Sequence, residues 1–170
     1  LWGRGGVGFD VFFWDGRVDA SSGDIRSQFG TMAPSGDPLV VSVHLPPVEF
    51  REMIGESDAT EWLRQGDVGA AAQVYQEIAR RIRETPEIAG PLAAASGLEV
   101  GELTYLQVAE AIAAFIRSEF RLRETRFHRF VFETEQLTDQ ELAGGLLFYG
   151  RGQCAACHTG AYFSDLQFHA

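Results

Sequence analysis

Apolar residues recur at helical spacing through the middle of the chain, between more polar segments. A first helix is predicted from Val68 to Ile82, with Asp67 as its cap and Pro86 as the residue before which it ends. A second helix is predicted to begin at the capping box Thr104–Gln107 and to carry a broad apolar face over the residues that follow. Both are expected to be core helices.

Three other segments have weaker patterns. Residues 58–65 are predicted to form a shorter helix. Residues 86–102 contain two prolines and three glycines, so we expect a connection with at most one helical turn. Residues 1–55 contain four of the six prolines and no sustained 3.6-residue period. We expect this region to be a long ordered loop that lies over other elements.

A third helix is predicted near the end of the chain. Thr138 and Glu141 have the spacing of a capping box, an apolar stripe follows them, and Gly150 and Gly152 end the pattern. Directly after these glycines comes the run Cys154-Ala155-Ala156-Cys157-His158, which contains both cysteines of the chain. The order is therefore a short amphipathic helix, a glycine turn and a CxxCH motif.

This motif is the pattern of a c-type haem attachment site. Two thiols three positions apart on a turn of helix can each add to one of the two vinyl groups of a haem. The adjacent imidazole of His158 then lies beneath the iron as its proximal ligand. Cys154, Cys157 and His158 are therefore the predicted cofactor-binding residues, and His158 is the predicted metal ligand.

Two other interpretations of the cysteines are a zinc site and a redox dithiol. A zinc site would need a second Cys or His pair at ligand spacing, and the sequence holds no further cysteine. A redox dithiol of the thioredoxin type belongs next to a βαβ pattern, whereas the segment before this motif is predicted to be helical. The pattern favours haem over both.

The length, hydrophobic content and net charge of the chain restrict the classes of function that it can have. The 170 residues are 45% hydrophobic, enough for one good core or parts of two smaller domains. A net charge of −10 argues against nucleic-acid binding and suits a partner with a basic face, such as a small soluble electron carrier. No apolar run is long enough to span a membrane. Covalent haem attachment normally takes place outside the cytoplasm, so a periplasmic or otherwise exported protein is expected.

The ordered set of motifs resembles the bacterial dihaem cytochrome c peroxidase family, which includes the MauG-like enzymes. The resemblance extends over nearly the whole chain. Its pieces, in order, are Phe13–Arg17, Gln28, Pro47, Glu52–Met53, Gly55, Thr104–Arg121, Leu137–Gly144, Leu147–Phe148, Gly150, Cys154–Gly160, Asp165 and Phe168–His169.

The resemblance implies a mainly α protein with cytochrome c-like haem domains and a long ordered N-terminal loop region. Residues 1–133 would be the C-terminal part of a peroxidatic domain, and residues 134–170 the start of a second, electron-transferring domain, so the chain is expected to be a central fragment. The chain would bind one haem c, and a second haem is expected upstream of it. Members of this family can also have a calcium ion between the domains and form a homodimer. Its partners would be hydrogen peroxide and a small electron-donor protein.

The resemblance also assigns roles to three residues before the haem motif. The family's glutamate and glutamine beside the peroxidatic iron fall on Glu52 and Gln28, and its tryptophan between the haems falls on Trp14. These residue types suit the chemistry. A carboxylate can move a proton between the peroxide oxygens, an amide can hold them without adding charge, and an indole can relay electrons.

Several alternatives stay open at this stage. A MauG-like enzyme would oxidise a protein or organic substrate, and a single-haem cytochrome would carry electrons without catalysis. Glu52 can also be an exposed carboxylate and Trp14 a loop anchor, while Asp15 and Arg17 are expected to fix their loop by an ion pair. The remaining histidines, His44, His128 and His169, are expected to have surface or hydrogen-bonded structural roles.

Overall fold

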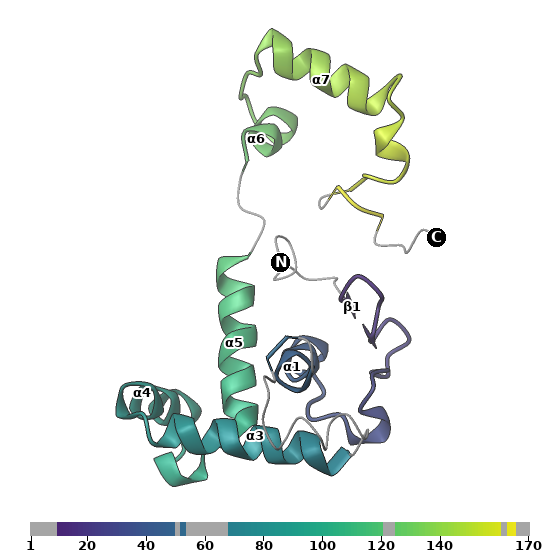
Figure 1. Ribbon diagram of the computed structural model, residues 1–170. Coiled ribbons are helices and arrows are strands. Elements are labelled where there is room, and N and C mark those ends of the chain that lie inside the picture. Colours follow the sequence, from purple (N-terminus) through teal and green to yellow (C-terminus); the bar gives the residue numbers. More distant parts are fainter. Residues whose placement is uncertain (1–9, 50–51, 54–67, 121–124, 161–162, 166–170) are drawn as a thin grey trace. The chain divides into compact units, whose positions relative to one another are not determined.

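The computed structural model describes residues 10–49, 52–53, 68–120, 125–160 and 163–165, and these are mainly helical (Figure 1). They fall into two compact units, one of residues 10–115 and one of the described residues from 116 on. The expected mainly α class is confirmed. The regular elements are β1 (Val11–Phe12), β2 (Val18–Asp19), α1 (Pro38–Val43), α3 (Val68–Arg83), α4 (Pro86–Ser96), α5 (Tyr105–Glu119), α6 (Arg126–Phe132) and α7 (Asp139–Tyr149).

The region before residue 50 is largely irregular, as expected, but it also contains regular structure. β1 and β2 pair in antiparallel fashion, with Phe12 opposite Val18. α1 is a buried helix that begins with Pro38 at its first turn, where the side chain of Asp37 accepts a hydrogen bond from the backbone N–H of Leu39. The sequence pattern missed α1 because its residues are almost uniformly apolar, so no amphipathic period marks a helix.

The centre of the first unit is the end of α1, which two tyrosines cap. The hydroxyl of Tyr75 in α3 donates to the carbonyl of His44 at 2.5 Å, and the hydroxyl of Tyr105 in α5 donates to the carbonyl of Val43 at 3.1 Å. The two phenol rings stack with centroids 4.9 Å apart. These bonds satisfy carbonyl groups that a helix leaves unpaired at its end, and they join α1, α3 and α5.

His44 lies inside this arrangement. Its side chain is buried, its Nδ1 bonds to the carbonyl of Val40 at 2.7 Å, and its ring packs edge-on against Tyr75 and Tyr105. Burial lowers the pKa of His44, which favours the neutral imidazole. The same environment raises the pKa of Tyr105 to about 12. The expected hydrogen-bonded structural role of His44 is confirmed.

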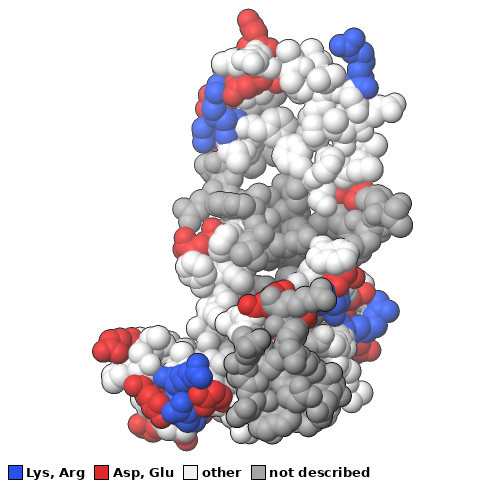
Figure 2. Space-filling model, viewed as in Figure 1, with Lys and Arg blue, Asp and Glu red and all other residues white. Residues whose placement is uncertain are grey.

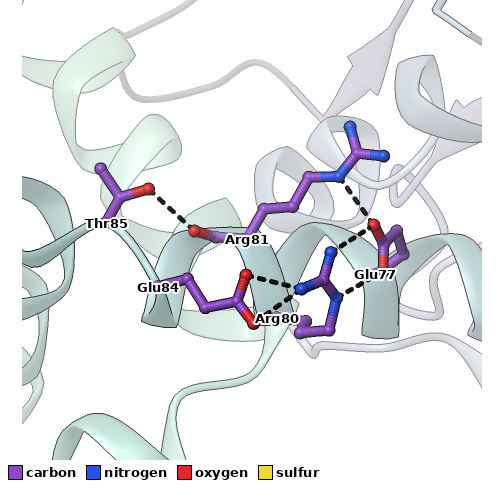
Figure 3. Close-up of polar contacts among 5 residues, drawn as sticks. All are labelled: Glu77, Arg80, Arg81, Glu84 and Thr85. Atoms are coloured by element: carbon purple, nitrogen blue, oxygen red, sulfur yellow. Dashed lines mark hydrogen bonds and ion pairs between the residues drawn. The ribbon is translucent and has the colours of Figure 1, made fainter.

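The predicted helices α3 and α5 are both confirmed. On the exposed side of α3, Arg80 pairs with Glu77 and Glu84, and Arg81 pairs with Glu77 (Figure 3). These pairs lower the pKa of Glu77 to about 2. Acidic and basic side chains lie next to one another on the face shown in Figure 2. Part of the acidic charge of the described surface is therefore locally paired with arginine.

The expectation of a simple connection over residues 86–102 is wrong, because an 11-residue helix, α4, occupies most of it. Pro86 stands at the first turn, where its missing N–H costs nothing. Pro91 removes one internal hydrogen bond, yet Ala89 and Ala93 pack with Leu103 in a small buried cluster. Gly97 ends the helix with a left-handed φ of 67°. The packing of alanines outweighs the helix-breaking tendency of Pro91.

The tyrosine cap gives a direct stability test. Replacing Tyr75 with Phe keeps the ring stack but leaves the carbonyl of His44 without its donor, so the free energy of unfolding should fall by about 1–2 kcal/mol. Urea unfolding of the intact protein measures this. Tyr149→Phe removes a hydroxyl from a ring that is 55% exposed and serves as the matched control. Equal unfolding midpoints for the two variants would contradict the role of the cap.

Candidate functional site

The candidate site lies in the second unit, where α6 contacts the start of α7. Thr138 and Glu141 form the predicted capping box at the start of α7, each bonding to the backbone N–H of the other. Arg126 of α6 donates to the Glu141 carboxylate at 2.9 Å and to the carbonyl of Gln136 at 2.7 Å. The capping bonds, together with the charge of Arg126, lower the pKa of Glu141. One arginine thus holds α6 against the start of α7.

The end of α7 is shaped by two glycines, as predicted. A Cβ atom on Gly150 would collide with the carbonyl of Leu146, and one on Gly152 would stand 2.6 Å from the carbonyl oxygen of Leu147 and 3.3 Å from the Cys154 sulfur. A side chain at either position would push the chain away from the helix end. The glycines therefore let the backbone turn back closely enough to place Cys154 directly after α7.

Both cysteines belong to one short helical turn, η4 (Cys154–Ala156), and its C-terminal cap Cys157. The backbone N–H groups of Cys157 and His158 both donate to the carbonyl of Cys154, at 3.3 and 2.9 Å. The two thiols are free and exposed. This is the predicted placement of two thiols on a turn of helix, and both can react with a ligand that lies on the surface.

His158 follows this turn and is oriented by a backbone carbonyl. Its Nδ1 lies 3.0 Å from the carbonyl oxygen of Phe163. A carbonyl only accepts hydrogen bonds, so Nδ1 carries the proton, and the lone pair is left on Nε2. The backbone N–H of Asp165 closes the same loop by donating to the carbonyl of Cys157 at 2.9 Å. In the neutral imidazole, Nε2 is therefore the nitrogen that is left to bind a metal.

The second unit carries an unusual amount of exposed apolar surface. No residue described in α6, α7 or η4 is buried. Leu146 is 77% and Phe132 74% exposed. Next to the motif, the ring of Phe163 lies 5.5 Å from that of Phe127 and 5.8 Å from that of Phe148. These residues fit a haem, because two exposed thiols, an oriented imidazole and apolar side chains match the thioether, iron and macrocycle contacts of such a group.

The other three candidate residues lie in the first unit, and all are exposed. Trp14 is 84% exposed, and Gln28 and Glu52 are also on the surface. Nothing in these positions tests the roles that the resemblance gives them.

A group of charges joins the loop of Trp14 to the turn that carries Glu52. Arg17 pairs with Asp15 at 2.8 Å, which confirms the expected ion pair, and with Glu49 at 3.6 Å. Hydrogen bonding to Asp15, together with the charges of Asp15, Glu49 and Glu52, raises the pKa of Arg17. The structure therefore brings the Trp14 loop and the Glu52 turn together through Arg17, and Gln28 is not a member of this group.

Sequence reasoning missed two participants in these sites. Phe163 acts on His158 through its backbone carbonyl, which leaves no signature in residue type. Glu49 could have been found, since it stands three residues before Glu52 and a turn at this point brings both carboxylates to one place; the N–H of Glu52 donates to the carbonyl of Glu49 at 3.0 Å. The predicted helix over 58–65, together with Gly55 and Phe168–His169, lies outside the described residues.

Comparison with models of protein families, with curated proteins and with solved structures finds no match to this chain. Within the described ranges, no group of three or more His, Cys, Asp or Glu side chains is placed to hold a metal ion. No helix among these residues is long and apolar enough to cross a bilayer, which agrees with the absence of a predicted span.

The glycine turn before Cys154 makes a testable prediction. In Gly152→Ala the new methyl group meets the Leu147 carbonyl, so the turn must open and the His158 amide should exchange its hydrogen about tenfold faster, equal to about 1.4 kcal/mol. Hydrogen exchange of the intact protein measures this. Gly144→Ala, at a helical position with open space around its Cα, is the control and should leave the exchange unchanged or slower. Equal exchange in the two variants would contradict the role of Gly152.

Proposed function

We propose that the second unit carries one covalently attached haem c, held by Cys154, Cys157 and His158. The observation that carries this proposal is the combination at one surface of two free exposed thiols and an imidazole whose Nδ1 is already bonded to a carbonyl. A redox dithiol has no need of an imidazole held in one tautomer, and a zinc site has no need of the apolar surface beside it. A haem site uses the two thiols, the oriented imidazole and the apolar surface together.

When bound, the haem supplies one-electron redox chemistry. The protein residues would hold and orient it. Each cysteine sulfur would form one thioether bond, and the Nε2 atom of His158 would coordinate the iron. The exposed leucines and aromatic rings of α7 and its flanks would exclude water from the macrocycle. α6, α7 and η4, whose described residues are all at least partly exposed, would thereby gain apolar burial.

We propose for the whole protein the activity of a dihaem cytochrome c peroxidase in the periplasm or another exported location. One hydrogen peroxide, two electrons and two protons give two water molecules. The electrons would come from a small c-type cytochrome or cupredoxin through the haem at His158. Residues 1–133 would complete a peroxidatic domain with a second haem bound upstream, and residues 134–170 would begin a cytochrome c-like domain. A calcium ion between the domains and a homodimer belong to the same proposal.

In this proposal Glu52 moves the proton. Its carboxylate would accept a proton from one peroxide oxygen and return it to the other as the O–O bond breaks. Gln28 would hold the oxygens by hydrogen bonds, and Trp14 would relay electrons between the haems. Support comes from the exposure of all three side chains, which leaves them accessible to an upstream domain, and from the Arg17 contacts that gather the Trp14 loop and the Glu52 turn.

The haem proposal predicts a defined stoichiometry. The intact parent protein, produced in a host that matures c-type cytochromes, should contain two haems per chain by mass and by pyridine haemochrome absorbance. A variant with Cys154→Ser and Cys157→Ser should lose one of them and keep the other. One haem in the parent protein would support a single-haem electron carrier and overturn the peroxidase. No loss of haem in the double variant would overturn the assignment of the motif.

The catalytic proposal predicts a large effect of one carboxylate. Glu52→Gln in the intact protein should lower peroxide turnover about 10²- to 10⁴-fold, because an amide cannot take the proton, while both haem spectra stay nearly unchanged. Turnover is measured with reduced cytochrome c as donor.

The neighbouring Glu49→Gln is the matched control, because it removes a nearby carboxylate that is paired with Arg17. A loss of turnover in Glu49→Gln with retention in Glu52→Gln would transfer the role to Glu49. Absence of any peroxide turnover in the wild-type protein with this donor would favour the MauG-like alternative, an oxidase of a protein or organic substrate.

A further inference from the structure

We propose that Phe163 is a positioning residue that sets the electron donation of His158, and with it the reduction potential of the haem. This inference rests on the proposed haem attachment at Cys154, Cys157 and His158. It concerns the loop after the motif, where one residue contributes a backbone carbonyl to the ligand and an aromatic ring to the surrounding cluster. The two contributions are coupled because they belong to the same residue.

The first observation is the backbone of Phe163. Its φ of 51° lies in the left-handed region, which is disfavoured for a residue with a bulky side chain. In this conformation its carbonyl oxygen lies 3.0 Å from the Nδ1 atom of His158. A disfavoured conformation persists only where the surrounding structure determines it, and such positions cluster at functional sites.

The second observation is what holds this conformation. The ring of Phe163 packs against those of Phe127 in α6 and Phe148 in α7, with centroids 5.5 and 5.8 Å away. Both distances are within the range of favourable aromatic pairs. The ring is thus in contact with two helices that both precede the motif in the sequence, whereas Phe163 itself follows the motif. Anchoring the ring fixes the position from which the carbonyl reaches His158.

Backbone hydrogen bonds also hold this loop, and the bond from the Asp165 N–H to the Cys157 carbonyl is one of them. The N–H of Phe163 donates to the carbonyl of Gly160 at 3.1 Å, and the N–H of Ser164 donates to that of Thr159 at 2.8 Å. The Ser164 N–H and the Phe163 carbonyl belong to one planar peptide unit, so the bond to Thr159 restrains the direction of that carbonyl. The aromatic contacts of the Phe163 ring add a second restraint, which acts through the side chain.

The consequence for the ligand follows from the chemistry of imidazole. A carbonyl that accepts a hydrogen bond from Nδ1–H increases the electron density on Nε2. The outer-shell partner of a metal-ligating histidine raises the basicity of the ligand in this way. A more basic Nε2 stabilises the ferric over the ferrous state, which lowers the potential. Weakening the hydrogen bond from His158 Nδ1 to the Phe163 carbonyl should therefore raise the reduction potential of the haem.

The test compares three variants of the intact haem-loaded protein. Phe163→Gly accepts a left-handed φ and keeps the carbonyl, but it removes the ring. It should shift the ferric-to-ferrous equilibrium about tenfold towards ferrous, which is about 59 mV upward for a one-electron couple. It should also speed the exchange of the His158 Nδ1 proton with solvent, seen by NMR of the ferrous protein. Phe163→Tyr keeps the ring and should restore wild-type values of both.

Phe130→Leu is the control for a general loss of aromatic packing, because it removes a 37% exposed ring from α6 rather than from the loop. It should leave the potential and the proton exchange unchanged. Wild-type potential and exchange in Phe163→Gly, with haem still attached, would overturn the positioning role. Equal shifts in Phe163→Gly and Phe130→Leu would do the same. Failure of the wild-type protein to bind haem through Cys154 and Cys157 would instead overturn the proposed function, and mass analysis distinguishes that case.

Discussion

The carbonyl groups at the end of α1 impose the main constraint on the first unit. α1 is short, buried and apolar, so its last carbonyls have little access to water and need donors from elsewhere. Tyr75 and Tyr105 supply them from two long helices. Because the donors are aromatic, the same residues also stack and enclose His44. The irregular chain before residue 50 is thereby held to the helical part of the unit.

The second unit meets a different constraint. Its helices are joined by polar contacts such as Arg126 with Glu141, while its leucines and aromatic rings are largely on the surface. Apolar surface of this extent beside a CxxCH motif suits a unit completed by a large apolar group. The well-defined polar geometry at the motif, with glycines before it and the Phe163 carbonyl after it, fixes the ligand atoms although no described residue of α6, α7 or η4 is buried.

Much of the helical framework could be predicted from sequence because its signals are local. The capping boxes at residues 104–107 and 138–141 located the starts of α5 and α7, and the glycines located the end of α7. α1 and α4 could not be predicted in the same way. The apolar run of α1 has no amphipathic period, and Pro91 in α4 is outweighed by packing of Ala89 and Ala93, which is a tertiary effect.

The candidate site shows the same division between local and non-local information. Cys154, Cys157 and His158 could be singled out from residue type and spacing alone, since thiol and imidazole chemistry depends on those side chains. The Nδ1 atom of His158 bonds to a backbone carbonyl five residues later, in a residue with a left-handed φ whose ring packs against rings from α6 and α7. Any residue type has that carbonyl. What selects Phe163 is its neighbours in space, and these become visible only when the chain is folded.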